Sequence, residues 1–146
     1  TTNLNIHHNT MSGNLATGHI RLGSTINTAN IRNNTSNNPR LGMLHVAGLS
    51  ASKVSITHNM VTSKMIAVSS VPGLTLSNNF EKTSNLGFIN QSSNDFRLTS
   101  SSPAINRGTT SGVPIVSDGK PDAGGYEYSV QNNTASPLTP TGLKVQ

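Results

Sequence analysis

Four basic side chains lie in short apolar stretches of the first half of this chain, where they could bind an anionic or hydroxylated ligand. They are His19, Arg21, His45 and Lys64. The stretches GHIRL (residues 18–22) and GMLHV (42–46) align at a spacing of 24 residues, which brings Arg21 and His45 to one repeat position. Neighbouring arginine and histidine side chains can hold a carboxylate or a pair of hydroxyls. The alternative is that these residues form ordinary solvated surface.

Carboxylates, by contrast, are scarce. The chain has five acids, and Glu81 is the only one within residues 1–94. A glycosidase needs two carboxylates about 5–9.5 Å apart. A lyase needs a base such as arginine, lysine or histidine and often a calcium ion held by carboxylates. The basic candidates are present in residues 1–94 but the calcium ligands are not. The catalytic residues therefore stay unknown, and any key carboxylates are expected before Thr1.

Two groups of residues raise the question of a metal ion. Asp118, Asp122 and Glu127 lie close together in sequence, and clustered carboxylates suit calcium. We expect them instead to accept hydrogen bonds from backbone amides or to pair with Arg97 and Arg107. Calcium remains the one conceivable cofactor.

The second group is a repeated column of His8, Asn33, His58 and Asn78. Its two histidines belong to repeats two apart, so we expect turn or ladder residues there and predict no metal site. Cysteine is absent, which excludes disulfides and thiolate metal sites.

The elements that position these side chains repeat along the chain. Four stretches are similar: LNIHHNTM (4–11), ANIRNNTS (29–36), VSITHNMV (54–61) and LTLSNNFE (74–81). Their last asparagines, at spacings of 25, 25 and 20, are Asn9, Asn34, Asn59 and Asn79. Each stretch alternates apolar and polar residues, as strands do. Such a period is typical of stacked units in a parallel β-solenoid, in which we expect the asparagines to adopt left-handed turns and form a ladder.

A second strand is predicted in each repeat, after the asparagine turn. Ile20, Leu44 and Ile66 are expected to point inward, because strand side chains alternate between faces. On the same reasoning Arg21 and His45 point outward. The residues just before the three inward ones are also expected to point outward; they are His19, Met43 and Met65.

Composition agrees with a solenoid and excludes several classes of protein. The 146 residues suffice for one domain, and 32% hydrophobic content suits repeats that bury only a narrow inner stripe. The net charge of +5 comes from scattered residues, with no basic run or aromatic set for nucleic acid. No apolar run approaches the roughly 20 residues of a membrane span.

The end of the chain carries the most specific motifs: DFRL (residues 95–98), SPAIN (102–106) and DAGGYEY (122–128). They resemble the C-terminal end of secreted bacterial right-handed parallel β-helix proteins of the pectate-lyase-like superfamily. Gly125 stands where alanine is usual in that family, a difference expected not to matter. The resemblance implies a carbohydrate-active protein, secreted or on the bacterial surface. It implies a substrate on the outer face of one sheet, here the face with His19, Arg21, His45 and Lys64.

The predicted organisation has three parts. Residues 1–93 form about four coils of an all-β, right-handed parallel β-helix. Residues 94–128 form a C-terminal cap that folds over the last coil, since an exposed strand edge invites aggregation. Residues 129–146 form a linker and the truncated start of a fibronectin type III module. The first coil has no cover of its own, so we expect upstream coils, as part of a longer chain or as a separate chain.

These observations predict the C-terminal portion of a secreted polysaccharide lyase or glycoside hydrolase. This portion would contribute structure and part of the groove for a polysaccharide or oligosaccharide. The competing hypothesis, which the scarcity of carboxylates favours, is a non-catalytic surface solenoid, adhesin or spacer. A tail-spike-like phage or toxin segment is a third.

Overall fold

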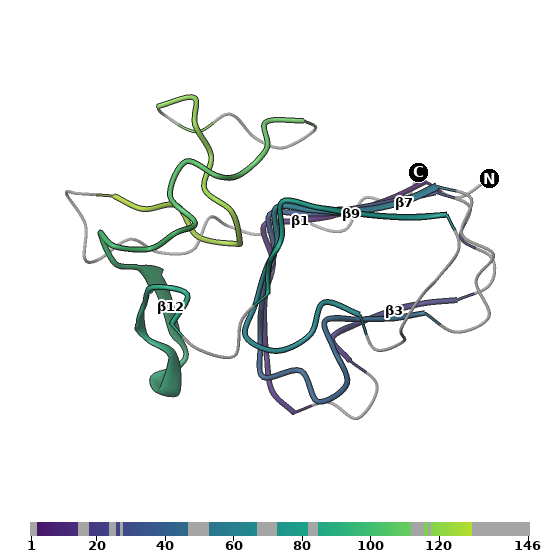
Figure 1. Ribbon diagram of the computed structural model, residues 1–146, viewed down its shortest axis with the longest axis horizontal. Helices are drawn as coiled ribbons and strands as arrows, with labels where there is room; N and C mark the ends of the chain where they lie inside the picture. The colour runs from purple at the N-terminus through teal and green to yellow at the C-terminus, as the bar shows by residue number, and fades with distance from the viewer. Residues whose placement is uncertain are drawn as a thin grey trace.

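The computed structural model is built of β-strands, as Figure 1 shows. The structure describes residues 3–14, 18–23, 26, 28–46, 53–66, 73–81, 85–111, 116 and 118–129. The strands are β1 (Asn3–His7), β2 (Thr10–Ser12), β3 (Ile20–Leu22), β4 (Thr28–Arg32), β5 (Thr35–Asn37), β6 (Leu44–Val46), β7 (Lys53–Thr57), β8 (Met60–Val61), β9 (Leu74–Ser77), β10 (Phe80–Glu81), β11 (Phe88–Asn90) and β12 (Asp95–Leu98). A short 3₁₀ helix, Gln91–Ser93, joins the last two.

The sequence repeat becomes a set of parallel sheets. The first sheet has the order β1-β4-β7-β9, and in it Ile6, Ile31, Ile56 and Leu76 lie in one row. The second sheet has the order β10-β8-β5-β2. The third pairs β3 with β6, and Ile66 extends it by a parallel bridge to Leu44. The predicted all-β class with parallel strands is confirmed, and we call these three sheets the stack.

The interior of the stack is filled by one face of each sheet. In β4 the burial alternates, so that Ala29 and Ile31 are buried between half-exposed neighbours. Ile31 and Ile56, which lie in the middle of their row, are 0% exposed. Burying a side chain of this size contributes about 1.5–3 kcal/mol. In β9, one of the two edge strands of this sheet, Leu76 of the same row is 47% exposed.

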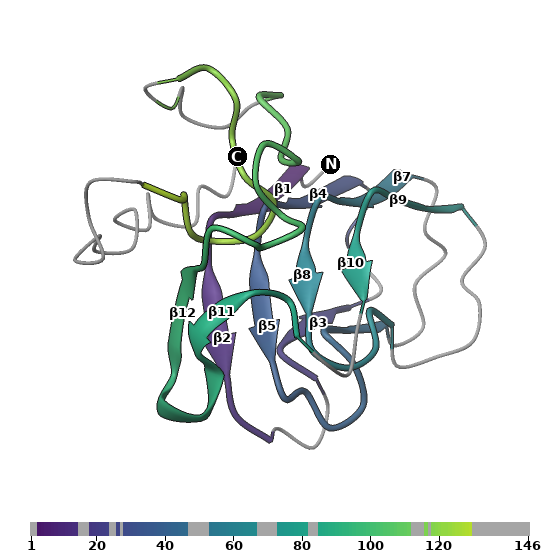
Figure 2. The ribbon, with the colours of Figure 1, turned by 60° about the vertical axis from the view of Figure 1, so that its left-hand side comes forward.

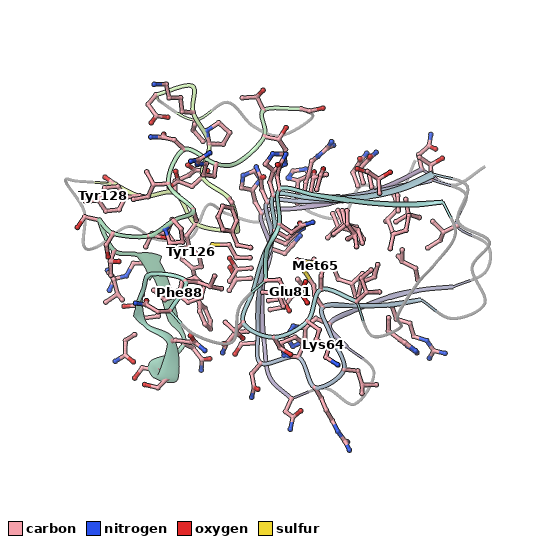
Figure 3. All side chains as sticks on the ribbon, viewed as in Figure 1. Lys64, Met65, Glu81, Phe88, Tyr126 and Tyr128 are labelled. Atoms are coloured by element: carbon pink, nitrogen blue, oxygen red, sulfur yellow. The ribbon has the colours of Figure 1, made fainter. Side chains whose placement is uncertain are left out.

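Met43 and Met65 depart from the expected outward orientation. Both are buried in the core of the stack together with Leu44, and Figure 3 shows Met65 inside it. The physical reason is their place at a corner: Met43 precedes β6 and follows Gly42, whose φ is 140°. Strand alternation does not apply at such a corner, so successive side chains can both point inward.

The described residues between 85 and 129, here called the covering segment, lie differently from the predicted cap. They pack along the outer face of the second sheet rather than over the end of the stack (Figure 2). The contacts run from Ser12 in β2, whose Oγ donates to Asn94 Oδ1 at 2.7 Å, to Phe80 in β10. The antiparallel pair β11–β12 belongs to this segment.

The outer face of the second sheet explains why the segment docks there. Met60 is buried on this face, and it packs in a second apolar cluster with residues of the covering segment: Leu86, Leu98, Ala104 and Ala123. The neighbouring Val61 belongs to the core of the stack. Burial of apolar side chains on both faces therefore favours lateral packing.

Gly125 is a second departure from expectation. A Cβ at this position would lie 2.9 Å from Asn9 O and 2.8 Å from Thr10 Oγ1. The backbone of the covering segment approaches the stack too closely for alanine without a shift. The glycine therefore matters for docking, contrary to the sequence-based expectation.

Two remaining predictions concern other parts of the chain. Residues 130–146, assigned to a linker and a fibronectin type III start, lie outside the described residues. Within the described part, no helix is long and apolar enough to cross a membrane.

Candidate functional site

The third sheet brings Arg21 and His45 together. Arg21 pairs with His45 in register across β3 and β6. Arg21 is exposed between two buried neighbours, Ile20 and Leu22, so its guanidinium points away from the core. His45 is half-buried, and its Nδ1 has no hydrogen-bond partner among the described residues. One cation and one imidazole thus lie side by side on the outer face of this sheet.

The other two predicted binding residues do not join this pair. The ring of His19 is bonded within the chain, with Nδ1 2.7 Å from Ser36 Oγ and Nε2 2.8 Å from Gly13 O. It braces the corner between the second and third sheets and has no free nitrogen for a ligand. Lys64 is exposed, but it lies two residues before Ile66, the bridge partner of Leu44, and so outside the row of Arg21 and His45.

The four repeated asparagines form a hydrogen-bonded ladder. Asn34 Oδ1 accepts from both the backbone N–H and the side-chain amide of Asn9, each at 3.0 Å. The same pair of bonds joins Asn34 to Asn59, and Asn59 to Asn79. The side-chain amides also donate to carbonyls of the first sheet, such as Ile31 O. These residues are structural, because every buried amide must find partners.

The left-handed turn occurs one residue before the ladder. The φ angles are 52°, 48°, 56° and 54° at His8, Asn33, His58 and Asn78. We call these four residues the corner column. It is the line on which the covering segment docks: Asn33 bonds the backbone of Thr109 twice, and Gly124 N–H donates to His58 O at 3.0 Å. This column therefore takes part in docking, and among the described residues its histidines do not belong to any group of three or more potential metal ligands.

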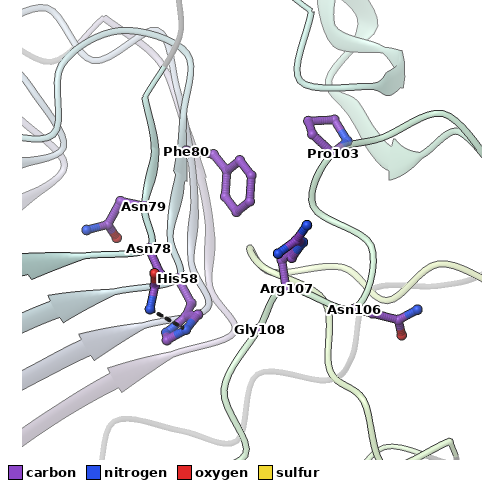
Figure 4. A pocket seen from close by; sticks show the side chains of 8 residues that line it. All are labelled: His58, Asn78, Asn79, Phe80, Pro103, Asn106, Arg107 and Gly108. Carbon is purple, nitrogen blue, oxygen red and sulfur yellow. Dashed lines mark hydrogen bonds between the residues drawn. The ribbon is translucent and has the colours of Figure 1, made fainter.

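A hollow of about 640 Å³ opens between the corner column and the covering segment (Figure 4). It is lined by His58, Asn78, Asn79, Phe80, Pro103, Asn106, Arg107 and Gly108. We call it the corner pocket. Phe80 and Arg107 reach into the space from opposite walls. None of the eight residues carries a carboxyl group.

The covering segment holds Arg107 through a fixed turn. Arg107 N–H donates to Ala104 O at 3.1 Å, and Asn106 has a left-handed φ of 56°. Asp122 fixes this turn, because its Oδ1 accepts from Asn106 N–H at 2.6 Å. At Gly108 a Cβ would lie 2.2 Å from Asp122 O, so only glycine fits. Arg107 itself is exposed and has no ion-pair partner among the described residues.

Two buried ionisable groups, His8 and Asp122, and the partly buried Glu127 lie where the covering segment meets the stack. Glu127 Oε1 lies 3.9 Å from Nε2 of His8, which is only 4% exposed. Burial raises the pKa of Glu127 to about 7 and lowers the pKa of His8 to about 4. Burial also raises the pKa of Asp122. Perturbed pKa values often mark active sites.

These buried acids are nevertheless held by the fold. Both oxygens of Asp122 accept backbone N–H bonds, from Asn106 and Tyr128, and Glu127 Oε2 accepts from Asp122 N–H at 2.9 Å. Asp118 accepts from Lys120 N–H. These carboxylates bind backbone amides, one of the two expected roles. They do not fit calcium, since among the described residues no three of His, Asp and Glu gather closely enough for a metal.

The expected pairing of these acids with arginine is absent from the described structure. Arg97 bonds Asp95 instead, with its Nε and one terminal nitrogen donating to the two carboxylate oxygens.

Comparisons of the chain with profiles of known protein families, with characterised proteins and with solved structures found no match.

The corner pocket was not found from the sequence. Phe80 was assigned only to the end of a repeat, and Arg107 only to the cap. Strand alternation was the one sequence signal for it. Because Phe80 and Glu81 are successive residues of one strand, a Glu81 that points inward places Phe80 on the outer face, where the pocket lies.

Proposed function

We propose that the stack is a section of a right-handed parallel β-helix. Three observations support this: each repeat contributes one strand to the first sheet and one to the second, the first-sheet strands pair in register at spacings of 25, 25 and 20 residues, and the asparagines form a ladder. The similarity of the last third to the endings of secreted bacterial β-helix proteins supports the same architecture. On that basis we propose a secreted or cell-surface setting.

The function we propose is binding of a polysaccharide that bears carboxylates, on the outer face of the third sheet. The observation that carries this proposal is the in-register pairing of Arg21 with His45. Guanidinium groups bind carboxylates through two parallel hydrogen bonds, and a neighbouring imidazole can bond an adjacent hydroxyl. A groove along this face would place successive sugars across successive strands.

The five acids of the chain point to binding rather than cleavage. Glu81 Oε1 accepts from Met65 N–H at 2.9 Å, and Asp95 is paired with Arg97. The remaining three bond backbone amides. Each of the five carboxylates is therefore engaged in at least one hydrogen bond within the chain, which favours a structural role over general acid–base work. In a polysaccharide lyase or glycoside hydrolase, the main catalytic residues would come from other coils, on the same or another chain.

A non-catalytic surface solenoid or adhesin is the second candidate. The hydrogen bonds that all five carboxylates make within the chain favour this candidate. The two candidates share the binding face and differ in whether neighbouring coils supply catalytic carboxylates.

Affinity gel electrophoresis with polygalacturonate tests the binding face. We expect the Arg21→Gln, His45→Gln double variant to be retarded at least about threefold less than the unmodified chain. Arg40→Gln, which removes one exposed arginine elsewhere, is the control and should change little. Dextran, which lacks carboxylates, should retard none of these proteins. Equal retardation of the double variant and the unmodified chain by polygalacturonate would refute the proposal.

A further inference from the structure

The corner pocket combines three groups that together fit one kind of ligand. Phe80 offers an apolar ring face, Arg107 a guanidinium, and Asn78 a side-chain amide. A volume of about 640 Å³ is in the range of small-molecule sites. The pocket lies at the corner between the first and second sheets, whereas Arg21 and His45 belong to the third. It is therefore separate from the face proposed above.

Arg107 provides the charge. Burial lowers the pKa of His58, so its imidazole is neutral at pH 7 and leaves Arg107 as the cation of the pocket. The guanidinium is exposed and free of described ion pairs, and the turn at Asn106 holds its backbone. An unpaired guanidinium on a held backbone favours planar anions, above all carboxylates.

Polar groups on the opposite wall can bond hydroxyls. Asn78 Nδ2 lies 3.3 Å from His58 Nε2. The amide nitrogen can only donate, so Nε2 accepts and Nδ1 of His58 carries the hydrogen. That N–H is buried without a partner in the described structure. Asn78 keeps a second N–H and its carbonyl oxygen for a ligand.

We propose that the corner pocket binds a sugar acid, with the carboxylate on Arg107, one ring face on Phe80 and hydroxyls on Asn78. A sugar acid has all three features in one small molecule: a carboxylate, a face of C–H groups and several hydroxyls. No lining residue carries a carboxyl group, so the pocket lacks the carboxylate pair of a glycosidase, and the role we assign to it is binding.

Nuclear magnetic resonance on the labelled full chain tests this proposal with sodium glucuronate as the probe. We expect glucuronate to shift the Gly108 amide and the His58 ring signals in a saturable way. Glucose, which lacks the carboxylate, should bind at least about tenfold more weakly, since a charge-assisted pair is lost. Binding of inorganic phosphate as tight as that of glucuronate would overturn the assignment to a sugar acid.

Two substitutions locate the site. Arg107→Gln should weaken glucuronate binding about tenfold or more. Arg40→Gln, the matched loss of an exposed arginine, should leave binding unchanged. Phe80→Leu keeps an apolar side chain but removes the aromatic face, and it should weaken glucuronate binding without weakening phosphate binding. Unchanged affinity in Arg107→Gln would refute the site.

The third-sheet variant separates this inference from the proposed function. Arg21→Gln with His45→Gln should bind glucuronate in the pocket as the unmodified chain does, even where it has lost retardation by polygalacturonate. Loss of pocket shifts in that variant would place glucuronate on the third sheet and refute the pocket.

Discussion

Asn33 and Thr109, 76 positions apart, are joined by two hydrogen bonds. Asn33 Nδ2 donates to Thr109 O at 3.1 Å, and Thr109 N–H donates to Asn33 Oδ1 at 3.2 Å. The side-chain amide of Asn33 thus both donates to and accepts from the backbone of Thr109, as the backbone of a neighbouring strand would. This relationship, together with the second apolar cluster, attaches the covering segment to the stack.

Removing the Asn33 amide should loosen the covering segment. Asn33→Gly keeps the left-handed backbone and deletes both hydrogen bonds. Each lost bond should lower the free energy of unfolding by about 0.5–1.5 kcal/mol. We expect lower stability in urea and faster hydrogen exchange at Thr109. Asn78→Gly is the matched control, because it has the same backbone and no bond to Thr109. Equal exchange at Thr109 in both variants would contradict this account.

The ladder should be most sensitive in its middle. Asn59→Ala leaves several buried groups without partners, among them the N–H of Asn34 and the carbonyl of Ile31. At about 1–3 kcal/mol for each unsatisfied group, we expect a loss of about 3 kcal/mol or more. Asn79→Ala, at the last described rung, should cost less. Urea denaturation measures both, and equal losses would argue against a continuous ladder.

Close backbone approach predicts the effect of alanine at Gly125. Gly125→Ala brings a Cβ within 2.9 Å of Asn9 O and should destabilise the protein by about 1–3 kcal/mol. Gly23→Ala is the control, since nothing lies within 4 Å of its Cβ position. Thermal unfolding compares the two. A Gly125→Ala protein as stable as Gly23→Ala would show that the segment docks less tightly than described.

The contributions of His8 and Glu127 to the pH dependence of stability should largely cancel between about pH 4.5 and 6.5. The folded pKa of Glu127 is raised from 4.5 to about 7, so its stabilisation is lost as pH rises through that range. The folded pKa of His8 is lowered from 6.5 to about 4, so its stabilisation is lost as pH falls. Where the two ranges overlap, the opposite slopes cancel.

Single substitutions should expose each slope, because burial is the larger cause of both pKa shifts. In Glu127→Gln the free energy of unfolding should decrease as pH falls from 6.5 towards 4. In His8→Asn, which suits the left-handed turn, it should decrease as pH rises from 4.5 towards 7. Each change is at most about 3 kcal/mol, and less where water screens the groups. Urea titrations across pH measure it, and parallel profiles in the two variants would contradict the cancellation.

Much of the stack could be predicted from the sequence. The spacings of 25, 25 and 20 residues indicated the parallel strands, and the alignment of Arg21 with His45 matches their pairing in the third sheet. This worked because each repeat contacts mainly its neighbours, so one register repeats along the chain. The alternating residues of 29–32 likewise matched the buried face of β4.

Other features were decided by tertiary structure. Met43 points inward because it lies at a corner. Both the column of Asn33 and that of Asn34 were expected to supply turn residues, and the left-handed turn falls at Asn33. The corner pocket exists only because Arg107, on the covering segment, meets Phe80 of the stack.

The chain by itself therefore determined the repeat, the strands and the rows of side chains, since these depend on local periodicity and contacts between adjacent repeats. That periodicity did not indicate where the covering segment docks. The place of docking depends on which outer face offers buried partners such as Met60, and on a backbone close enough to require glycine at position 125. Those are properties of surfaces that exist only after the strands have assembled.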